Sequence, residues 1–148
     1  METAFREDGK VVAEECIDGR EIECAVLGND APVASVVGEV LPCNEFYDYN
    51  AKYIDGDSVL CIPADLPQEK SDEVRANAVK AFKALGCTGL SRVDFFVRRS
   101  DNQVLFNEIN TLPGFTAISM YSKLFAESGI PYGELIDRLI TLAEERAK

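Results

Sequence analysis

Two polar segments on either side of a turn carry the residues best suited to chemistry. Arg92 and Asp94 lie in the first segment, and Glu108 and Asn110 lie in the second. Apolar residues alternate with them at a period of two, which predicts two strands whose polar side chains share one face. These apolar residues are Val93, Phe95, Val97, Leu105 and Ile109.

The turn between the two segments sets which residues face each other. Residues 100–102 are Ser-Asp-Asn, which are turn formers, and the asparagine tolerates a left-handed backbone. A three-residue loop there pairs Arg99 with Gln103. Counted back along both strands, this register places Asp94 opposite Glu108. A two-residue loop would set both acids against apolar partners, which the alternation disfavours.

Two directly opposed carboxylates need a cation between them. At roughly 5 Å their repulsion is about 3 kcal/mol at an effective dielectric of 20. The same register places Arg92 opposite Asn110, so that carboxylate and amide oxygens, the ligands that Mg²⁺ prefers, share one face. Zinc is disfavoured because the chain has no histidine. We therefore predict a magnesium site, with a solvated acidic hairpin face as the alternative.

Composition limits the kinds of protein this can be. The 148 residues are 47% apolar and 28% charged, which is enough for one globular domain. A net charge of −11 disfavours nucleic acid and anionic membranes as partners. The five cysteines form no Cys-x-x-Cys pair, and no apolar run approaches the roughly 20 residues of a membrane span. We expect a soluble protein of the reducing cytoplasm.

The order of expected strands and helices predicts an α+β fold in which helices pack against an antiparallel sheet. A long aromatic loop is expected over residues 42–56. Besides the hairpin, alternation and turn signals predict strands over 11–14, 22–27, 33–40 and 59–62. Helical spacing predicts three helices, the first ending at Gly86, the others over 119–128 and 133–146. The expected inward residues are Val74, Ala78, Ala81, Phe82 and Leu85 in the first helix and Leu135, Ile136, Leu139, Ile140 and Ala143 in the last.

Three motifs follow one another in the order found in one enzyme family. They are 46–53 (FYDYNAKY), 92–94 (RVD) and 106–116 (FNEINTLPGFT). Together they closely resemble the D-alanine:D-alanine ligases of the ATP-grasp superfamily. The resemblance runs from residue 14 to the last helix, yet covers only the C-terminal part of such an enzyme. The N-terminal substrate domain and the central subdomain with its glycine-rich loop are not found in 1–148.

The resemblance implies a reaction and its cofactors. The intact enzyme would phosphorylate one D-alanine with ATP, and a second D-alanine would attack the acyl phosphate, for peptidoglycan synthesis. Asp94, Glu108 and Asn110 match the magnesium ligands, with Glu108 bridging two ions and Mn²⁺ as an alternative ion. Arg92 matches the arginine that stabilises the charge on the acyl phosphate, assisted by the Gly114 amide. The resemblance is also compatible with a homodimer, and the 148-residue part is expected to be inactive alone.

Other residues match substrate contacts of the family. Ser119 opens a predicted helix and matches the residue that binds the carboxylate of the second D-alanine, although an ordinary N-cap is the alternative. Lys52 matches a lysine on the nucleotide phosphates, and without the resemblance it is a solvated lysine. Tyr53 matches a loop residue that closes the site and favours D-alanine as acceptor.

The adenosine part of ATP is implied to contact five positions. Glu14, Cys16 and Ile17 match the stretch beside adenine, Glu21 matches the ribose contact, and Phe46 matches the residue against the base. Without the resemblance, the apolar residues among these five would be interpreted as core residues of strands.

Two rival functions stay open. One is a related ligase with D-lactate or D-serine as acceptor, and the other is a nonenzymatic acidic module that binds Ca²⁺ or a protein.

Overall fold

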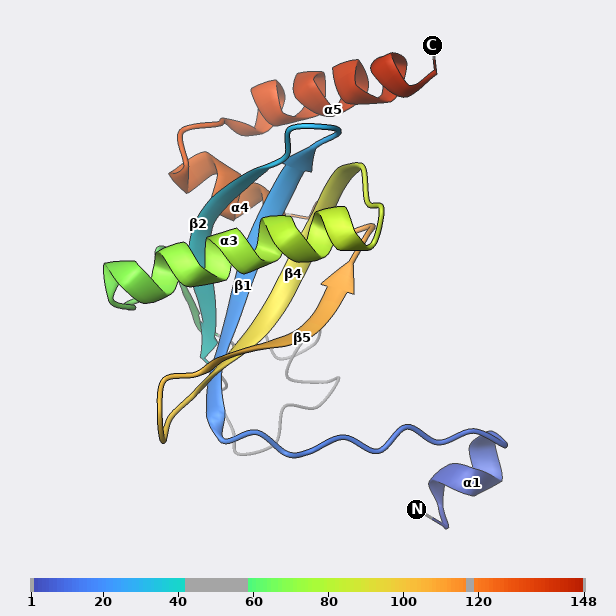
Figure 1. The fold of residues 1–148 in the computed structure, drawn as a ribbon. Helices are drawn as coiled ribbons and strands as arrows, with labels where there is room; N and C mark the ends of the chain where they lie inside the picture. The colour runs from blue at the N-terminus through green and yellow to red at the C-terminus, as the bar shows by residue number, and fades with distance from the viewer. Residues whose placement is uncertain (1, 42–58, 117–118, 148) are drawn as a thin grey trace.

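In the part of the chain that the structure describes, five strands form a single antiparallel sheet in the order β3-β2-β1-β4-β5 (Figure 1). The computed structural model describes residues 2–41, 59–116 and 119–147, so the predictions for the 42–56 loop and for Phe46, Lys52 and Tyr53 lie outside the described residues. The strands are β1 (Gly19–Gly28), β2 (Val33–Leu41), β3 (Val59–Cys61), β4 (Gly89–Arg98) and β5 (Val104–Asn110), and the helices are α1 (Ala4–Glu7), α3 (Gln68–Ala84), α4 (Met120–Glu127) and α5 (Tyr132–Arg146).

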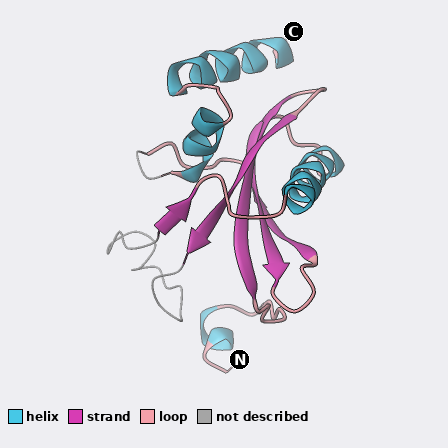
Figure 2. Ribbon diagram, turned by 90° about the vertical axis from the view of Figure 1, so that its left-hand side faces the viewer, coloured by secondary structure: helices cyan, strands magenta, loops and turns pink. Residues whose placement is uncertain are grey.

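The helices cover both faces of the sheet, which confirms the predicted α+β class. Figure 2 shows α3 against one face and α4 against the other, with α5 beyond α4 at one end of the sheet. Each face therefore has its own apolar core. Within the described ranges, no helix is long and apolar enough to span a bilayer.

The α3 face is built on helical spacing in the sequence. Val74, Ala78 and Phe82 are fully buried against the strand residues of that face. Leu85, which we expected to point inward, is instead 60% exposed because it caps the helix. Gly86 then adopts a φ of +66°, a conformation that favours glycine and that ends the helix as predicted.

The α4 face depends on one close approach between helix and strand. A Cβ at Gly38 of β2 would lie 2.9 Å from Leu124 and 3.0 Å from the Met120 sulfur, so the missing side chain lets α4 rest on the sheet. Tyr121 and Phe125 are buried there, and the Tyr121 hydroxyl donates to the Val26 carbonyl at 3.1 Å.

Helix α5 uses a different inward stripe from the predicted one. Leu135, Leu139 and Leu142 pack on the α4-face core, whereas Ile140 and Ala143 are exposed. Both stripes recur at helical spacing, and the packing against α4 and the sheet selects between them.

The predicted strand over 11–14 is wrong. Residues 8–18 contain no strand, and β1 begins only at Gly19. Both edges of β1 are already paired, with β2 and with β4, so an earlier strand would find no free edge there. Val12 accordingly is 84% exposed.

The β4–β5 hairpin gives the predicted pairs by a different route. Asp94 lies opposite Glu108 and Arg92 opposite Asn110, as expected. The turn, however, has four residues, because Arg98 rather than Arg99 pairs with Gln103.

A bulge between the turn and the site restores the register. The pairing shifts by one residue between Asp94 and Phe95, where Asn107 has no partner, and the pairs beyond it then match the prediction. Because the residues nearer the turn are out by one, Leu105 faces Phe96 and so lies on the polar face, not on the apolar face we expected. Asn102 has the predicted left-handed backbone, with a φ of 56°.

Candidate functional site

Three acidic residues form a row across three neighbouring strands. Glu23 of β1 lies opposite Asp94 of β4, which lies opposite Glu108 of β5. Two residues along the strands, Arg92 lies opposite Asn110. The alternation of the strands puts all five side chains on one face of the sheet. The hairpin prediction, which held that an arginine, two acids and an amide share a face, is confirmed by the register.

Arg92 holds two buried carboxylates together. Its Nε and Nη2 donate to the Asp94 Oδ1 and Oδ2 atoms at 2.8 and 2.7 Å, and its Nε lies 3.1 Å from Glu23 Oε2. Counted over the whole residue, backbone included, Asp94 is 3% exposed and Glu23 is 4% exposed. Burial by itself lowers the pKa of Arg92, but the hydrogen bonds to Asp94 and the charges of Glu23, Asp94 and Glu108 outweigh it and raise the pKa above the ordinary value.

Glu23 is the site residue that the sequence analysis missed. It alternates with Ile22 and Cys24, which are fully buried on the opposite face. The available signal was a charged residue inside the predicted strand 22–27, whose other residues are apolar. Its partners come from β4, about 70 residues later in the chain, so sequence spacing alone could not place it beside Arg92.

The predicted metal ligands differ in how open they are. Asp94 is buried and both of its oxygens contact Arg92, whereas Glu108 is exposed. Asn110 is half-buried, and its Oδ1 accepts a hydrogen bond from the Leu112 amide at 3.2 Å. No group of three or more acidic, cysteine or histidine side chains poised to hold a metal occurs among the residues that the structure describes. The donors present, two carboxylates and an amide oxygen, suit a hard cation that keeps water or phosphate as its other ligands.

The loop after β5 brings Gly114 and Ser119 together. A Cβ at Gly114 would lie 3.0 Å from the Ser119 Oγ, so only glycine allows this approach without a shift. Ser119 occupies the N-cap position of α4, but its hydroxyl makes no capping bond. It instead accepts from the Thr116 amide at 2.9 Å and lies 2.8 Å from the Thr116 Oγ1. The hydroxyl therefore belongs to the loop rather than to the helix end.

A cleft of about 560 Å³ lies beside the acidic row and collects three of the residues expected near adenine. Glu14, Cys16 and Ile17 line one side of it, and Phe96 and Leu105 line the sheet side. Phe96 pairs with Leu105 in the row next to Asp94 and Glu108. Phe96 follows Asp94 by two residues in β4, and Leu105 precedes Glu108 by three residues in β5.

Glu21, the expected ribose contact, belongs to this second row as well. It lies opposite Phe96 in the β1–β4 pairing and is half-buried. The row of Glu21, Phe96 and Leu105 thus lies between the acidic row and the cleft that Glu14, Cys16 and Ile17 line.

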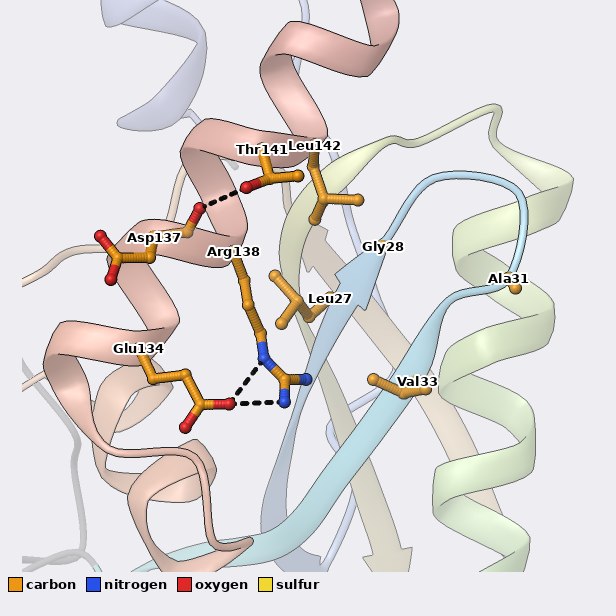
Figure 3. Close-up of a pocket in the computed structure, with 9 residues that line it drawn as sticks. All are labelled: Leu27, Gly28, Ala31, Val33, Glu134, Asp137, Arg138, Thr141 and Leu142. Atoms are coloured by element: carbon orange, nitrogen blue, oxygen red, sulfur yellow. Dashed lines mark hydrogen bonds and ion pairs between the residues drawn. The ribbon is translucent and has the colours of Figure 1, made fainter.

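A second cavity, of about 430 Å³, lies at the other end of β1, between α5 and the β1–β2 turn (Figure 3). Leu27, Val33 and Leu142 give it an apolar lining. Arg138 reaches across its mouth, but its Nε and Nη2 are both bonded to Glu134, at 3.0 and 2.6 Å. Of the expected site residues in 2–41, 59–116 and 119–147, none lines this cavity.

Thiol chemistry offers a test of which cleft takes the nucleotide. Cys16 is exposed in the 560 Å³ cleft, whereas Cys24 is fully buried and burial raises the pKa of its thiol to about 12. At pH 8 we expect iodoacetamide to modify Cys16 at least about a hundredfold faster than Cys24, because only the thiolate reacts. Peptide mapping by mass spectrometry measures both rates.

Bound nucleotide should then slow the modification of Cys16 severalfold and leave that of Cys87 unchanged, because Cys87 lies away from this cleft, packed beside the α3-face core. Equal protection of both cysteines would point to general tightening rather than to occupation of the cleft.

Comparisons with known proteins identify the family. A family model described as "D-ala D-ala ligase C-terminus" matches residues 1–141. The D-alanine–D-alanine ligase of Acetivibrio thermocellus is 64% identical over 97% of this chain and 38% of its own length. The crystal structure of the VanG D-Ala:D-Ser ligase from Enterococcus faecalis has a TM-score of 0.83, with 40% identity over 95% of this chain and 41% of that one.

A third relative was solved with nucleotide. The D-alanine–D-alanine ligase of Bacillus anthracis complexed with ATP has a TM-score of 0.77, with 34% identity over 97% of this chain and 46% of that one. The chain spans about 40% of the length of the curated relatives it matches. It therefore belongs to the D-alanine–D-alanine ligase family, of which it forms the C-terminal portion, with the C-terminal part of the ATP-grasp fold.

Proposed function

We propose that this chain is the nucleotide- and magnesium-binding part of an ATP-dependent ligase that joins two D-alanines for peptidoglycan synthesis. The observation that carries the proposal is the pairing of Asp94 with Glu108 and of Arg92 with Asn110 on the sheet face beside the 560 Å³ cleft. The relative solved in complex with ATP supports the use of this nucleotide. The cytoplasmic location and the homodimer stay predictions.

The reaction consists of two displacements. A carboxylate oxygen of the first D-alanine attacks the γ-phosphorus of ATP, the bond to ADP breaks, and an acyl phosphate forms. The amine of the second D-alanine attacks the acyl carbon, the bond to phosphate breaks, and the amine loses a proton as inorganic phosphate leaves.

The chain's own side chains would position and stabilise these groups. The Arg92 guanidinium presents a planar set of donors that suits the charge developing on the acyl phosphate, and the Gly114 amide would donate to the same region. Ser119 Oγ, held near Gly114, would receive the carboxylate of the second D-alanine.

The residues expected to hold Mg²⁺ are Asp94, Glu108 and Asn110. When bound, the ion would neutralise the transferring phosphate oxygens and keep them in line. Both oxygens of Asp94 already accept a hydrogen bond from the Arg92 guanidinium, so a bound ion would share or weaken these contacts. For Lys52 and Tyr53 the proposed roles, phosphate contact and site closure, rest on the sequence.

A chimera tests the function directly. Because the Acetivibrio thermocellus ligase aligns with 97% of this chain, its remaining N-terminal part can be fused ahead of residue 1. The chimera is expected to release phosphate from ATP and to form D-alanyl-D-alanine, whereas the 148-residue chain alone is expected to form none. Mass spectrometry of the product with D-alanine, D-serine and D-lactate in competition identifies the acceptor.

A folded chimera whose phosphate release does not respond to any of these acceptors would contradict the proposed function. Preference for D-serine would favour the rival ligase, to which the VanG relative points. The unmodified Acetivibrio enzyme is the positive control.

A further inference from the structure

We propose that Glu23 is a positioning residue that keeps the Arg92 guanidinium in place when Asp94 turns to the metal. The inference rests on the proposed function, which requires one carboxylate, that of Asp94, to serve both an arginine and a cation. Arg92 contacts both Asp94 and Glu23, so loss of the first contact leaves it the second.

The strand order assigns the two carboxylates different tasks. The sheet runs β1-β4-β5, so Glu23 lies on the side of Asp94 away from β5, where Glu108 and Asn110 stand. Strands are spaced by about 4.8 Å, which puts the backbone of Glu23 roughly 10 Å from that of Glu108. Glu23 can therefore hold the arginine without joining the proposed ligand set.

Helix α4 closes the other side of the row. The next position beyond Glu23 is Gly38 of β2, where an added Cβ would meet Leu124 and Met120 of α4. Glu23 is 4% exposed between this apolar wall and Arg92. The Glu23 carboxylate should therefore remain in contact with the Arg92 guanidinium, because a buried charge without a partner is strongly destabilising.

An experiment on the 148-residue chain needs no ligand. The Nε–H of Arg92 donates to Asp94, and the Nε atom lies 3.1 Å from Glu23 Oε2, so the hydrogen exchange of this group, followed by NMR, reports on both contacts. Asp94→Asn imitates the loss of the Asp94 charge to a cation. We expect the Nε–H to stay protected in Asp94→Asn and to exchange at least tenfold faster when Glu23→Gln is added.

The matched control is Glu127→Gln, an equal charge change at an exposed position of α4. Combined with Asp94→Asn, it should leave the exchange of the Arg92 Nε–H unchanged. If Glu23→Gln also leaves the exchange rate unchanged in the Asp94→Asn background, Glu23 does not anchor Arg92 and the inference is wrong.

Should the double variant fail to fold, Glu23→Gln alone is examined with and without Mg²⁺ and a nonhydrolysable ATP analogue. Faster exchange only in the presence of both ligands is then the expected result, and equal rates would overturn the inference.

The chimera supplies a second readout. Glu23→Gln is expected to lower kcat tenfold or more while the Mg²⁺ dependence and the KM for ATP stay within threefold. A loss of Mg²⁺ affinity as large as that of Asp94→Asn would make Glu23 a ligand and overturn the inference. An inactive wild-type chimera would instead contradict the proposed function, and the exchange measurement on the 148-residue chain would still decide the role of Glu23.

Discussion

Glu108→Gln in the chimera is expected to lower the rate of ADP release by about a thousandfold, equivalent to about 4 kcal/mol of transition-state stabilisation. The substitution keeps the shape of the side chain and removes the charge that the proposed Mg²⁺ would need. Since Glu108 is exposed, the free energy of unfolding should change by less than about 0.5 kcal/mol. Activity should therefore be lost from a protein that is otherwise intact.

Steady-state ADP release at increasing Mg²⁺ is the measurement. High Mg²⁺ should recover part of the lost rate, because a weakened ligand set fills at higher concentration. The control is again Glu127→Gln, which removes one negative charge from an exposed position on α4. If Glu108→Gln turns over as fast as this control, Glu108 is not a metal ligand and the solvated acidic face becomes the better interpretation.

The hairpin shows how far local pattern can reach. Alternation together with an assumed three-residue loop predicted that Asp94 faces Glu108, and the structure confirms the pair although the loop has four residues. The extra residue in the turn and the bulge at Asn107 compensate for each other. The pairs near the site are therefore the same as without either feature. The error appears only at Leu105, between the bulge and the turn, which shows that register at one end of a hairpin does not fix it at the other.

Contacts between distant segments could not be obtained in the same way. The sequence shows Glu23 as a charge inside an apolar strand, but not that β1 lies beside β4. The two stripes of α5 are equally periodic, and the choice of Leu135, Leu139 and Leu142 over Ile140 depends on the surface that the helix meets. In both cases the missing information is tertiary, since it depends on which elements become neighbours.

Arg92→Met is expected to lower the free energy of unfolding by about 3–5 kcal/mol, because it leaves two buried carboxylates without their shared cation. The side chains concerned are well covered, with 13% of Arg92, 6% of Glu23 and 5% of Asp94 exposed, so water can replace little of the lost interaction. Methionine keeps much of the apolar stem of arginine and so limits the effect to the lost charge and hydrogen bonds.

Urea unfolding followed by circular dichroism measures this change in the 148-residue chain. Arg138→Met is the matched control, because Arg138 also pairs with a glutamate but both side chains are nearly half exposed, at 47% and 48%. Its loss should cost no more than about 0.5 kcal/mol. Adding Asp94→Asn to Arg92→Met should restore part of the stability, since one of the two unpaired charges is then gone. A loss for Arg92→Met no larger than that of the control would mean that Glu23 and Asp94 find water or other partners, and the picture of one guanidinium neutralising two buried acids would have to be abandoned.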